Sequence, residues 1–149
     1  MSGIIPTERI FFLASWLAII AGVVMIIGGG WATVFTYQTV AREHITTPPD
    51  ATIPNTPVLG PFTLHSQADA IRKHVLDTTG GRTYAEMSRD EDRSIWITAT
   101  TLITALHLGI ITYLFAGLII LGGLITAWTG WCLARCAAML HKEDHEDNH

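Results

Sequence analysis

Charged side chains are scarce in this sequence. Only 15% of its 149 residues are charged and 49% are hydrophobic, whereas about 25% charged residues is typical of soluble domains. Residues 10–41 contain no charged side chain, and His107 is the one residue of the range 94–134 that could carry a charge. The composition therefore favours an integral membrane protein over a soluble domain.

Several functional signatures are absent as well. A formal net charge of −4 and the lack of a dense basic stretch argue against a nucleic-acid partner. The sequence contains no glycine-rich phosphate loop, nucleophile elbow, HExxH motif or CxxCH haem attachment. Loop polarity explains the histidines and acids between the apolar blocks, such as His44, His65, His74 and Glu86. We therefore expect no enzyme activity, no catalytic residue, no cofactor and no metal site.

The first apolar block predicts a membrane-spanning helix, since a span needs about 20 apolar residues and this block is longer. The block also exceeds the roughly 7–15 residues of a signal-peptide core, and no clear small-x-small cleavage site follows it. We interpret it as an uncleaved anchor, with a span at residues 10–37 after an amino-terminal segment at residues 1–9. The helix is expected to continue through Gly28, Gly29 and Gly30, because glycine is common in membrane helices.

The segment at residues 38–93 is a loop of different character. It carries six basic residues, eight acidic residues and five of the six prolines. The prolines predict an extended or turn-like chain at residues 46–61, because proline removes an amide donor and restricts the residue before it. Near the end of the loop, the spacing of Thr83 and Glu86 predicts a helical turn that leads directly into the last long helix.

A short helix is predicted inside this loop at about residues 67–78. Ser66 and Asp69 have the spacing of a capping box. A narrow apolar stripe follows, and Gly80 and Gly81 provide a stop.

The second apolar block predicts one long helix at residues 94–135. Its roughly 40 residues would extend ~60 Å, about twice the hydrocarbon thickness of a bilayer. Counting back from the charged Arg135 places the span at about residues 109–133 and leaves the first four turns outside the lipid. A histidine-rich and acidic tail follows at residues 136–149. We expect loop side chains to cover the apolar residues of the outer turns, namely Phe62, Ile71, Val75 and Tyr84.

Cysteine placement favours one topology. Cys132 and Cys136 lie at the carboxyl-terminal membrane boundary, and the loop contains no cysteine. Free thiols suit the reducing cytoplasmic face. The count of basic residues does not decide the orientation, because the loop has six and the two tails have three. We expect both termini in the cytoplasm and the loop outside.

Three sets of side chains could carry chemistry. Cys132 and Cys136 could bind metal, accept palmitate or form a disulfide with a partner. Two thiolates are an incomplete zinc site, so the simpler interpretation is that both cysteines serve as small apolar side chains at a helix end. His107 could serve as a proton relay or ligand, although its expected place at the outer interface gives it access to water. The third set is His141, His145 and His149, which could line a helix face for a divalent metal. Acidic residues surround them, and this favours a frayed, solvated tail over a metal site.

Small residues recur every four positions in both apolar blocks, and they allow membrane helices to approach closely. These rows either join the two helices to each other or bind a larger partner, and the sequence leaves both open. They are Ala14, Ala18 and Gly22 in the first block and Gly122, Thr126, Gly130 and Ala134 in the second.

A series of short motifs marks the loop and its flanks. They are Glu43-His44-Ile45, Pro49-Asp50-Ala51, Gly60-Pro61-Phe62-Thr63, Gln67-Ala68, His74, Gly80-Gly81 and Thr83-Tyr84-Ala85-Glu86. In these motifs, over about residues 40–115, the chain resembles a family of small actinobacterial two-helix membrane proteins that are often labelled aromatic ring-opening dioxygenases. The resemblance implies an extracytoplasmic loop and supplies no known catalytic residue. The sequence shows no non-haem iron triad that would support the dioxygenase label. By size, topology and lineage the chain also resembles accessory subunits of the cytochrome bcc-aa3 respiratory supercomplex.

These observations predict an all-α membrane protein with two transmembrane helices, a small extracytoplasmic helical and irregular cap between them, and a second helix that extends beyond the membrane. The first functional hypothesis is a non-catalytic accessory or structural subunit of a larger plasma-membrane complex, in contact with lipid. A second is a standalone cell-envelope sensor or ligand-binding protein. An enzyme or redox protein of the dioxygenase label is a third.

Overall fold

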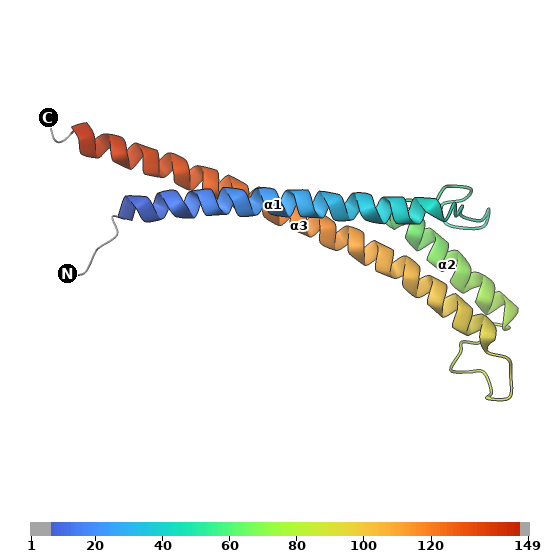
Figure 1. Cartoon of the computed structure of the whole chain (residues 1–149). Coiled ribbons are helices and arrows are strands. Elements are labelled where there is room, and N and C mark those ends of the chain that lie inside the picture. Colours follow the sequence, from blue (N-terminus) through green and yellow to red (C-terminus); the bar gives the residue numbers. More distant parts are fainter. Residues whose placement is uncertain (1–6, 147–149) are drawn as a thin grey trace. The chain divides into compact units, whose positions relative to one another are not determined.

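The computed structural model describes residues 7–146, with side chains from residue 10 to 139. This part of the chain forms three helices and no strand: α1 (Thr7–Arg42), α2 (Pro61–Thr78) and α3 (Ser94–Glu146) (Figure 1). Its one β-type contact is an isolated antiparallel bridge between Thr46 and Pro57. The all-helical prediction is therefore confirmed for the described residues.

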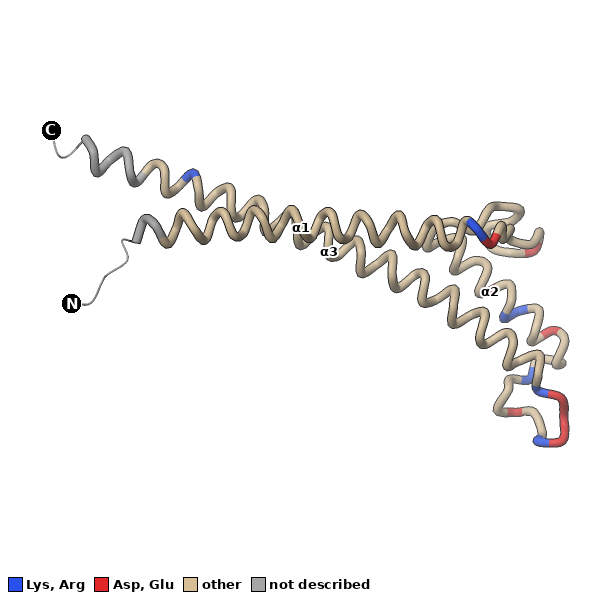
Figure 2. The backbone as a smooth tube through the Cα atoms, in the orientation of Figure 1, with Lys and Arg blue, Asp and Glu red and all other residues tan. Residues whose placement is uncertain are grey.

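Both long helices are apolar over lengths that could cross a membrane. Ile10–Arg42 has 33 residues and a mean hydropathy of 2.7, and Ser94–Met139 has 46 residues and a mean hydropathy of 2.4. Figure 2 shows long uncharged stretches in both helices: within residues 10–139, Arg42 at the end of α1 and Arg135 in α3 are their two charged residues. Only 11% of the most apolar window in each helix is buried within the chain. Apolar surface of this extent suits contact with lipid or with other protein.

Both long helices continue beyond their expected ends. α1 reaches Arg42 instead of residue 37, and α3 continues to Glu146 instead of residue 135. No proline or glycine interrupts either extension, and Arg42 lies in the last turn of α1, where a cation favours the helix dipole. The backbone of the tail is therefore helical through Glu146. The side chains of His141 and His145, and all of His149, lie outside the described residues.

α2 begins at Pro61, six residues before the predicted start. Proline is favourable in the first helical turn, where its missing amide needs no partner. The Oγ1 atom of Thr63 accepts hydrogen bonds from the amides of Gly60 (3.1 Å) and Leu59 (3.0 Å). The predicted capping box at Ser66 was wrong: Ser66 is buried, and its hydroxyl accepts a hydrogen bond from the amide of Ile53 at 2.9 Å.

The predicted helical turn before α3 is also absent, and residues 82–93 form turns and bends. The expected pairing nevertheless occurs, because the Glu86 carboxylate accepts hydrogen bonds from the amide (2.7 Å) and hydroxyl (2.8 Å) of Thr83. Met87 then enters the core and is 7% exposed. Asp92 lies two residues before α3, and its Oδ1 atom accepts a hydrogen bond from the amide of Ser94 at 2.9 Å. Hydrogen bonds from the amide and hydroxyl of Thr83 hold the pKa of Glu86 below its ordinary value, and those from the side chain and amide of Ser94 do the same for the pKa of Asp92.

The described residues divide into two compact units. The middle unit is Ala32–Phe115, and the helix-pair unit contains the described residues of Met1–Trp31 and Ala116–His149. The core of the middle unit joins α2, the turn after it and the start of α3 through Val75, Met87, Trp96 and Ala99, with Ile71 and Leu76 packed against them.

Two of the four side chains expected to cover the start of α3 do so. Val75 and Ile71 belong to the core around Trp96. The indole N–H of Trp96 donates a hydrogen bond to the carbonyl of Arg82 at 3.0 Å, which satisfies its polar atom in the core. Phe62 does not fulfil this expectation, because it is 82% exposed. Tyr84 fulfils it only in part, because it lines a groove with Trp96 but is 44% exposed.

The proline-rich segment before α2 is folded and not simply extended. The amide of Thr47 donates to the carbonyl of Thr56 (3.0 Å), and the amide of Thr56 donates to the Thr47 hydroxyl (3.0 Å). Val58 is 1% exposed, and its amide donates to the carbonyl of Ile45 at 2.9 Å. Paired backbone groups let this irregular segment bury side chains.

Candidate functional site

In the helix-pair unit, α1 and α3 approach backbone to backbone. A Cβ atom on Gly22 would lie 2.5 Å from the carbonyl oxygen of Gly123, and one on Gly130 would lie 2.7 Å from that of Ser15. At Gly29 a Cβ would lie 2.9 Å from the carbonyl oxygen of Ala116. Side chains larger than hydrogen do not fit at these glycines, so the contact depends on small residues.

The contacting positions recur every seven residues. On α1 they are Ser15, Gly22 and Gly29, and on α3 they are Ala116, Gly123 and Gly130; all six are buried. A seven-residue repeat is the pattern of helices that pack along a left-handed seam. The Ser15 hydroxyl donates to the carbonyl of Phe12 at 2.8 Å, so the one polar side chain in the seam is satisfied within its own helix.

The predicted four-residue rows match this seam only in part. Gly22 and Gly130 belong to it, but Ala14 is exposed. A Cβ on Gly122 would lie 3.2 Å from the methyl carbon of Met25, so Gly122 also faces α1. Of the two alternatives left open by the sequence, the contacts favour the one in which the small residues join the helices to each other.

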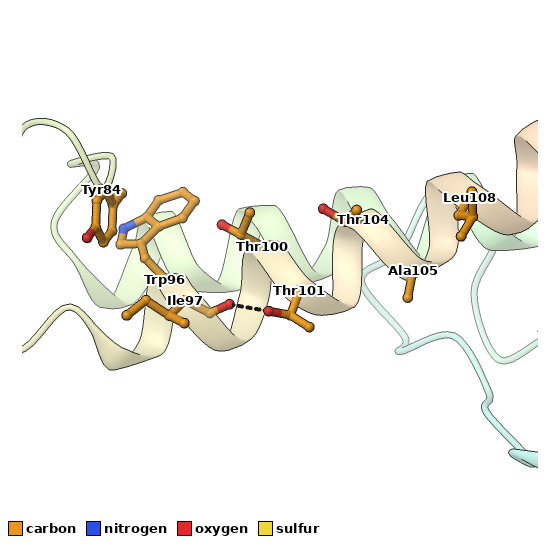
Figure 3. Close-up of a pocket in the computed structure, with 8 residues that line it drawn as sticks. All are labelled: Tyr84, Trp96, Ile97, Thr100, Thr101, Thr104, Ala105 and Leu108. Carbon is orange, nitrogen blue, oxygen red and sulfur yellow. Dashed lines mark hydrogen bonds between the residues drawn. The ribbon is translucent and has the colours of Figure 1, made fainter.

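An open groove lies along α3 in the middle unit, within the turns predicted to precede the span. Its volume is about 580 Å³ and its lining is mainly apolar. Tyr84 and Trp96 stand together at one end and Leu108 lies at the other (Figure 3). The groove is lined by Tyr84, Trp96, Ile97, Thr100, Thr101, Thr104, Ala105 and Leu108.

The Tyr84 end of the groove is held by Arg93. The Arg93 guanidinium lies 4.9 Å from the centre of the Tyr84 ring, within the range of a cation–π contact. Arg93 also donates hydrogen bonds to the carbonyls of Ser88 (3.0 Å) and Met87. The Thr101 hydroxyl donates to the carbonyl of Ile97 at 2.9 Å, so the polar atom of this lining side chain is satisfied within α3. This end of the groove is therefore defined by contacts and is not a loose loop.

His107 is exposed near the other end of the groove. Its ring centre lies 6.5 Å from that of His65, and the Nε2 atom of His65 lies 3.4 Å from a carboxylate oxygen of Asp69. Within the described residues, no group of three or more His, Cys, Asp or Glu is arranged to hold a metal ion. The pair of histidines is thus a surface contact between α2 and α3.

Cys132 and Cys136 are free thiols on α3; Cys132 is half-buried and Cys136 is exposed. Close by, the Arg135 guanidinium lies 5.1 Å from the centre of the Trp131 ring. Trp131 in turn lies 5.3 Å from Trp128, centre to centre. Aromatic and basic side chains of this kind are typical of a helix end at a membrane–water interface.

Asp50 connects the proline-rich segment to α2. One of its carboxylate oxygens lies 2.9 Å from the Nε2 atom of His74 and accepts a hydrogen bond from the Lys73 ammonium at 3.1 Å. The hydrogen bonds from His74 and then from Lys73 hold the pKa of Asp50 below its ordinary value. These side chains are exposed, so the contact orients the segment and adds little to global stability.

No protein-family model, no curated protein and no solved structure matched the chain in comparisons with known proteins.

Proposed function

We propose that the chain crosses the plasma membrane twice and acts as a non-catalytic accessory subunit of a larger integral membrane assembly. The resemblance in size, topology and lineage to accessory subunits of the cytochrome bcc-aa3 supercomplex makes that actinobacterial respiratory assembly the favoured partner. Lipid covers the remaining apolar surface of the two long helices in this proposal.

The groove on α3 is the observation that carries the proposal. Residues of its lining at positions 97, 101, 104 and 108 have the spacing of one helix face, and small threonines lie between the bulkier Ile97 and Leu108. A face of this kind accepts a second helix, whose ridge of side chains can enter the groove. The glycine seam is occupied by contacts within the chain, so it is not the surface offered to a partner.

The partner proposal is tested with a matched pair of arginine variants. Thr104 lines the groove, and Thr98 is exposed on the same helix but outside the lining. Thr104→Arg should accumulate in the membrane and separate from the large complex on a native gel, whereas Thr98→Arg should remain bound. Native complexes of the wild type should also show a haem spectrum. Migration of the wild-type chain alone after the gentlest extraction would remove the support for an accessory subunit.

The orientation is a separate part of the proposal, with both termini in the cytoplasm and the loop outside. Asp77 is exposed on α2 and suits a reporter cysteine better than Thr79, which is 8% exposed. Asp77→Cys in a chain without Cys132 and Cys136 should react with a membrane-impermeant maleimide in intact spheroplasts. Reaction only after lysis would mean the opposite orientation.

A ligand-binding protein of the cell envelope is the second candidate, because the groove volume of about 580 Å³ lies in the range of small-molecule sites. In that case, the chain purified alone should carry a small molecule detectable by native mass spectrometry. Thr104→Arg should lose that molecule and Thr98→Arg should retain it.

A further inference from the structure

Phe62, near the start of α2, is the most exposed large apolar side chain in the described part of the protein. It is 82% exposed, although the sequence predicted that it would cover α3. Leu64, two residues later, is 1% exposed. Two residues correspond to about 200° around a helix, so Phe62 projects away from the side on which Leu64 is buried.

The chain on each side of Phe62, at Leu59 and at Leu64, contacts one short stretch of α3. The Tyr113 hydroxyl donates a hydrogen bond to the carbonyl of Leu59 at 2.8 Å. A Cβ on Gly109 would lie 3.3 Å from a methyl carbon of Leu64. The exposed ring of Phe62 is therefore held close to the level of residues 109–113 of α3.

This level coincides with the membrane interface if α3 spans the bilayer. Tyr113 and Trp131 are about 18 residues apart on one helix, or ~27 Å at about 1.5 Å per residue, close to the hydrocarbon thickness of about 30 Å. Trp16 and Tyr37 on α1 are separated by a similar ~32 Å on the same estimate. Tyrosine and tryptophan are enriched at both interfaces of membrane proteins.

The chain around Phe62 also lacks charge. Residues 51–64 contain no Asp, Glu, Lys or Arg, whereas the rest of residues 42–93 carries six basic and eight acidic residues. An uncharged segment that ends in an exposed phenylalanine suits the boundary between headgroups and acyl chains, where aromatic side chains bind.

We propose that Phe62 is an interfacial anchor that inserts into the phospholipids of the membrane spanned by α3. Its ring would contact the upper acyl chains and hold the start of α2 on the membrane surface. The inference rests on the spanning part of the proposed function and not on a partner protein. Lipid is the favoured occupant because Tyr113, which fixes the position of this turn, lies at the expected level of the interface.

The experiment uses the full chain, purified alone and reconstituted into liposomes of phosphatidylcholine and phosphatidylglycerol. In a chain with Cys132→Ser and Cys136→Ser, a nitroxide is attached at Phe62→Cys or, as the matched control, at Asp77→Cys on the same helix. Paramagnetic resonance then compares collisions with oxygen, which concentrates in lipid, and with a nickel chelate, which stays in water. The label at position 62 should collide at least several times more with oxygen relative to nickel than the label at position 77.

Equal ratios at the two positions would place residue 62 in water and overturn the anchor. Low collision rates with both reagents at position 62 would indicate that protein, such as a second copy of the chain, covers it, and would also overturn the anchor. If Phe62→Cys does not fold, wild-type chain in liposomes with a diazirine-bearing acyl chain provides the second measurement: the peptide containing Phe62 should carry the lipid adduct. An unlabelled peptide would contradict the proposal. No partner protein is present, so the outcome is independent of the accessory-subunit hypothesis.

Discussion

Gly22 and Gly123 are packed against each other through their backbones. A Cβ on Gly22 would lie 2.5 Å from the Gly123 carbonyl oxygen, and a Cβ on Gly123 would lie 2.7 Å from the Gly22 carbonyl oxygen. Lipid provides no hydrophobic drive for helix association, so such close packing is a main source of attraction between membrane helices. The reciprocal contact makes this glycine pair the most sensitive point of the seam.

Gly22→Ala should therefore weaken the association of α1 with α3. The added methyl group meets backbone atoms that cannot rotate away, and overpacking of this kind costs about 1–3 kcal/mol. Gly28→Ala is the matched control, because nothing lies within 4 Å of a Cβ at Gly28. Reversible denaturation in mixed micelles should show a lower midpoint for Gly22→Ala than for the control. Equal midpoints would mean that the seam does not hold the helices together.

Tyr113→Phe should loosen the segment before α2. The change removes the 2.8 Å hydrogen bond to the Leu59 carbonyl and retains the ring, with an expected loss of about 1 kcal/mol. Hydrogen exchange in residues 57–60 should accelerate by about fivefold, the factor that corresponds to this energy. Tyr84→Phe, at an exposed tyrosine elsewhere in the middle unit, should leave that exchange unchanged. Acceleration by both variants would point to a general effect on the middle unit.

Asp50→Asn should release the proline-rich segment from α2 at neutral pH. The pKa of Asp50 is lowered by hydrogen bonds from His74 and Lys73, so the folded state favours the ionised carboxylate. The contact is complete above the ordinary pKa range of aspartate and is lost as the pH falls through the lowered folded pKa. Limited proteolysis of residues 48–56 at neutral pH should be faster in the variant, and hydrogen exchange should show that wild type approaches the variant only in strong acid. A wild-type contact that opens near pH 6 would contradict this assignment.

Replacement of both cysteines by alanine should leave the abundance of the protein in the membrane unchanged. Cys132 is half-buried and Cys136 is exposed, so little packing is lost with either thiol. Quantitative immunoblotting of membrane fractions measures the effect. A large decrease would reveal a lipid, metal or covalent partner that depends on these thiols.

The helices of this protein were predictable to different degrees. The two long apolar blocks predicted α1 and α3 because hydrocarbon permits few other conformations for an uncharged chain. The start of α2 was misplaced because Ser66 and Asp69 imitate a capping box, whereas Pro61 and Thr63 provide the start. Thr83 and Glu86 formed their predicted pair without a helix, since one local pair cannot meet the cost of nucleating a helix when Met87 turns into the core.

The sequence by itself determined that the chain forms two long apolar helices, because long stretches without charge are stable as helices that could span a lipid bilayer. Only the tertiary structure decided which residues face each other. Gly, Ala and Thr are so frequent in α1 and α3 that repeats of four and of seven residues are both present in the sequence. The backbone contacts at Gly22, Gly29 and Gly130 select the seven-residue seam. The tertiary structure likewise left Phe62 exposed, because the opposite side of this turn, at Leu64, is the one that packs on α3 at Gly109.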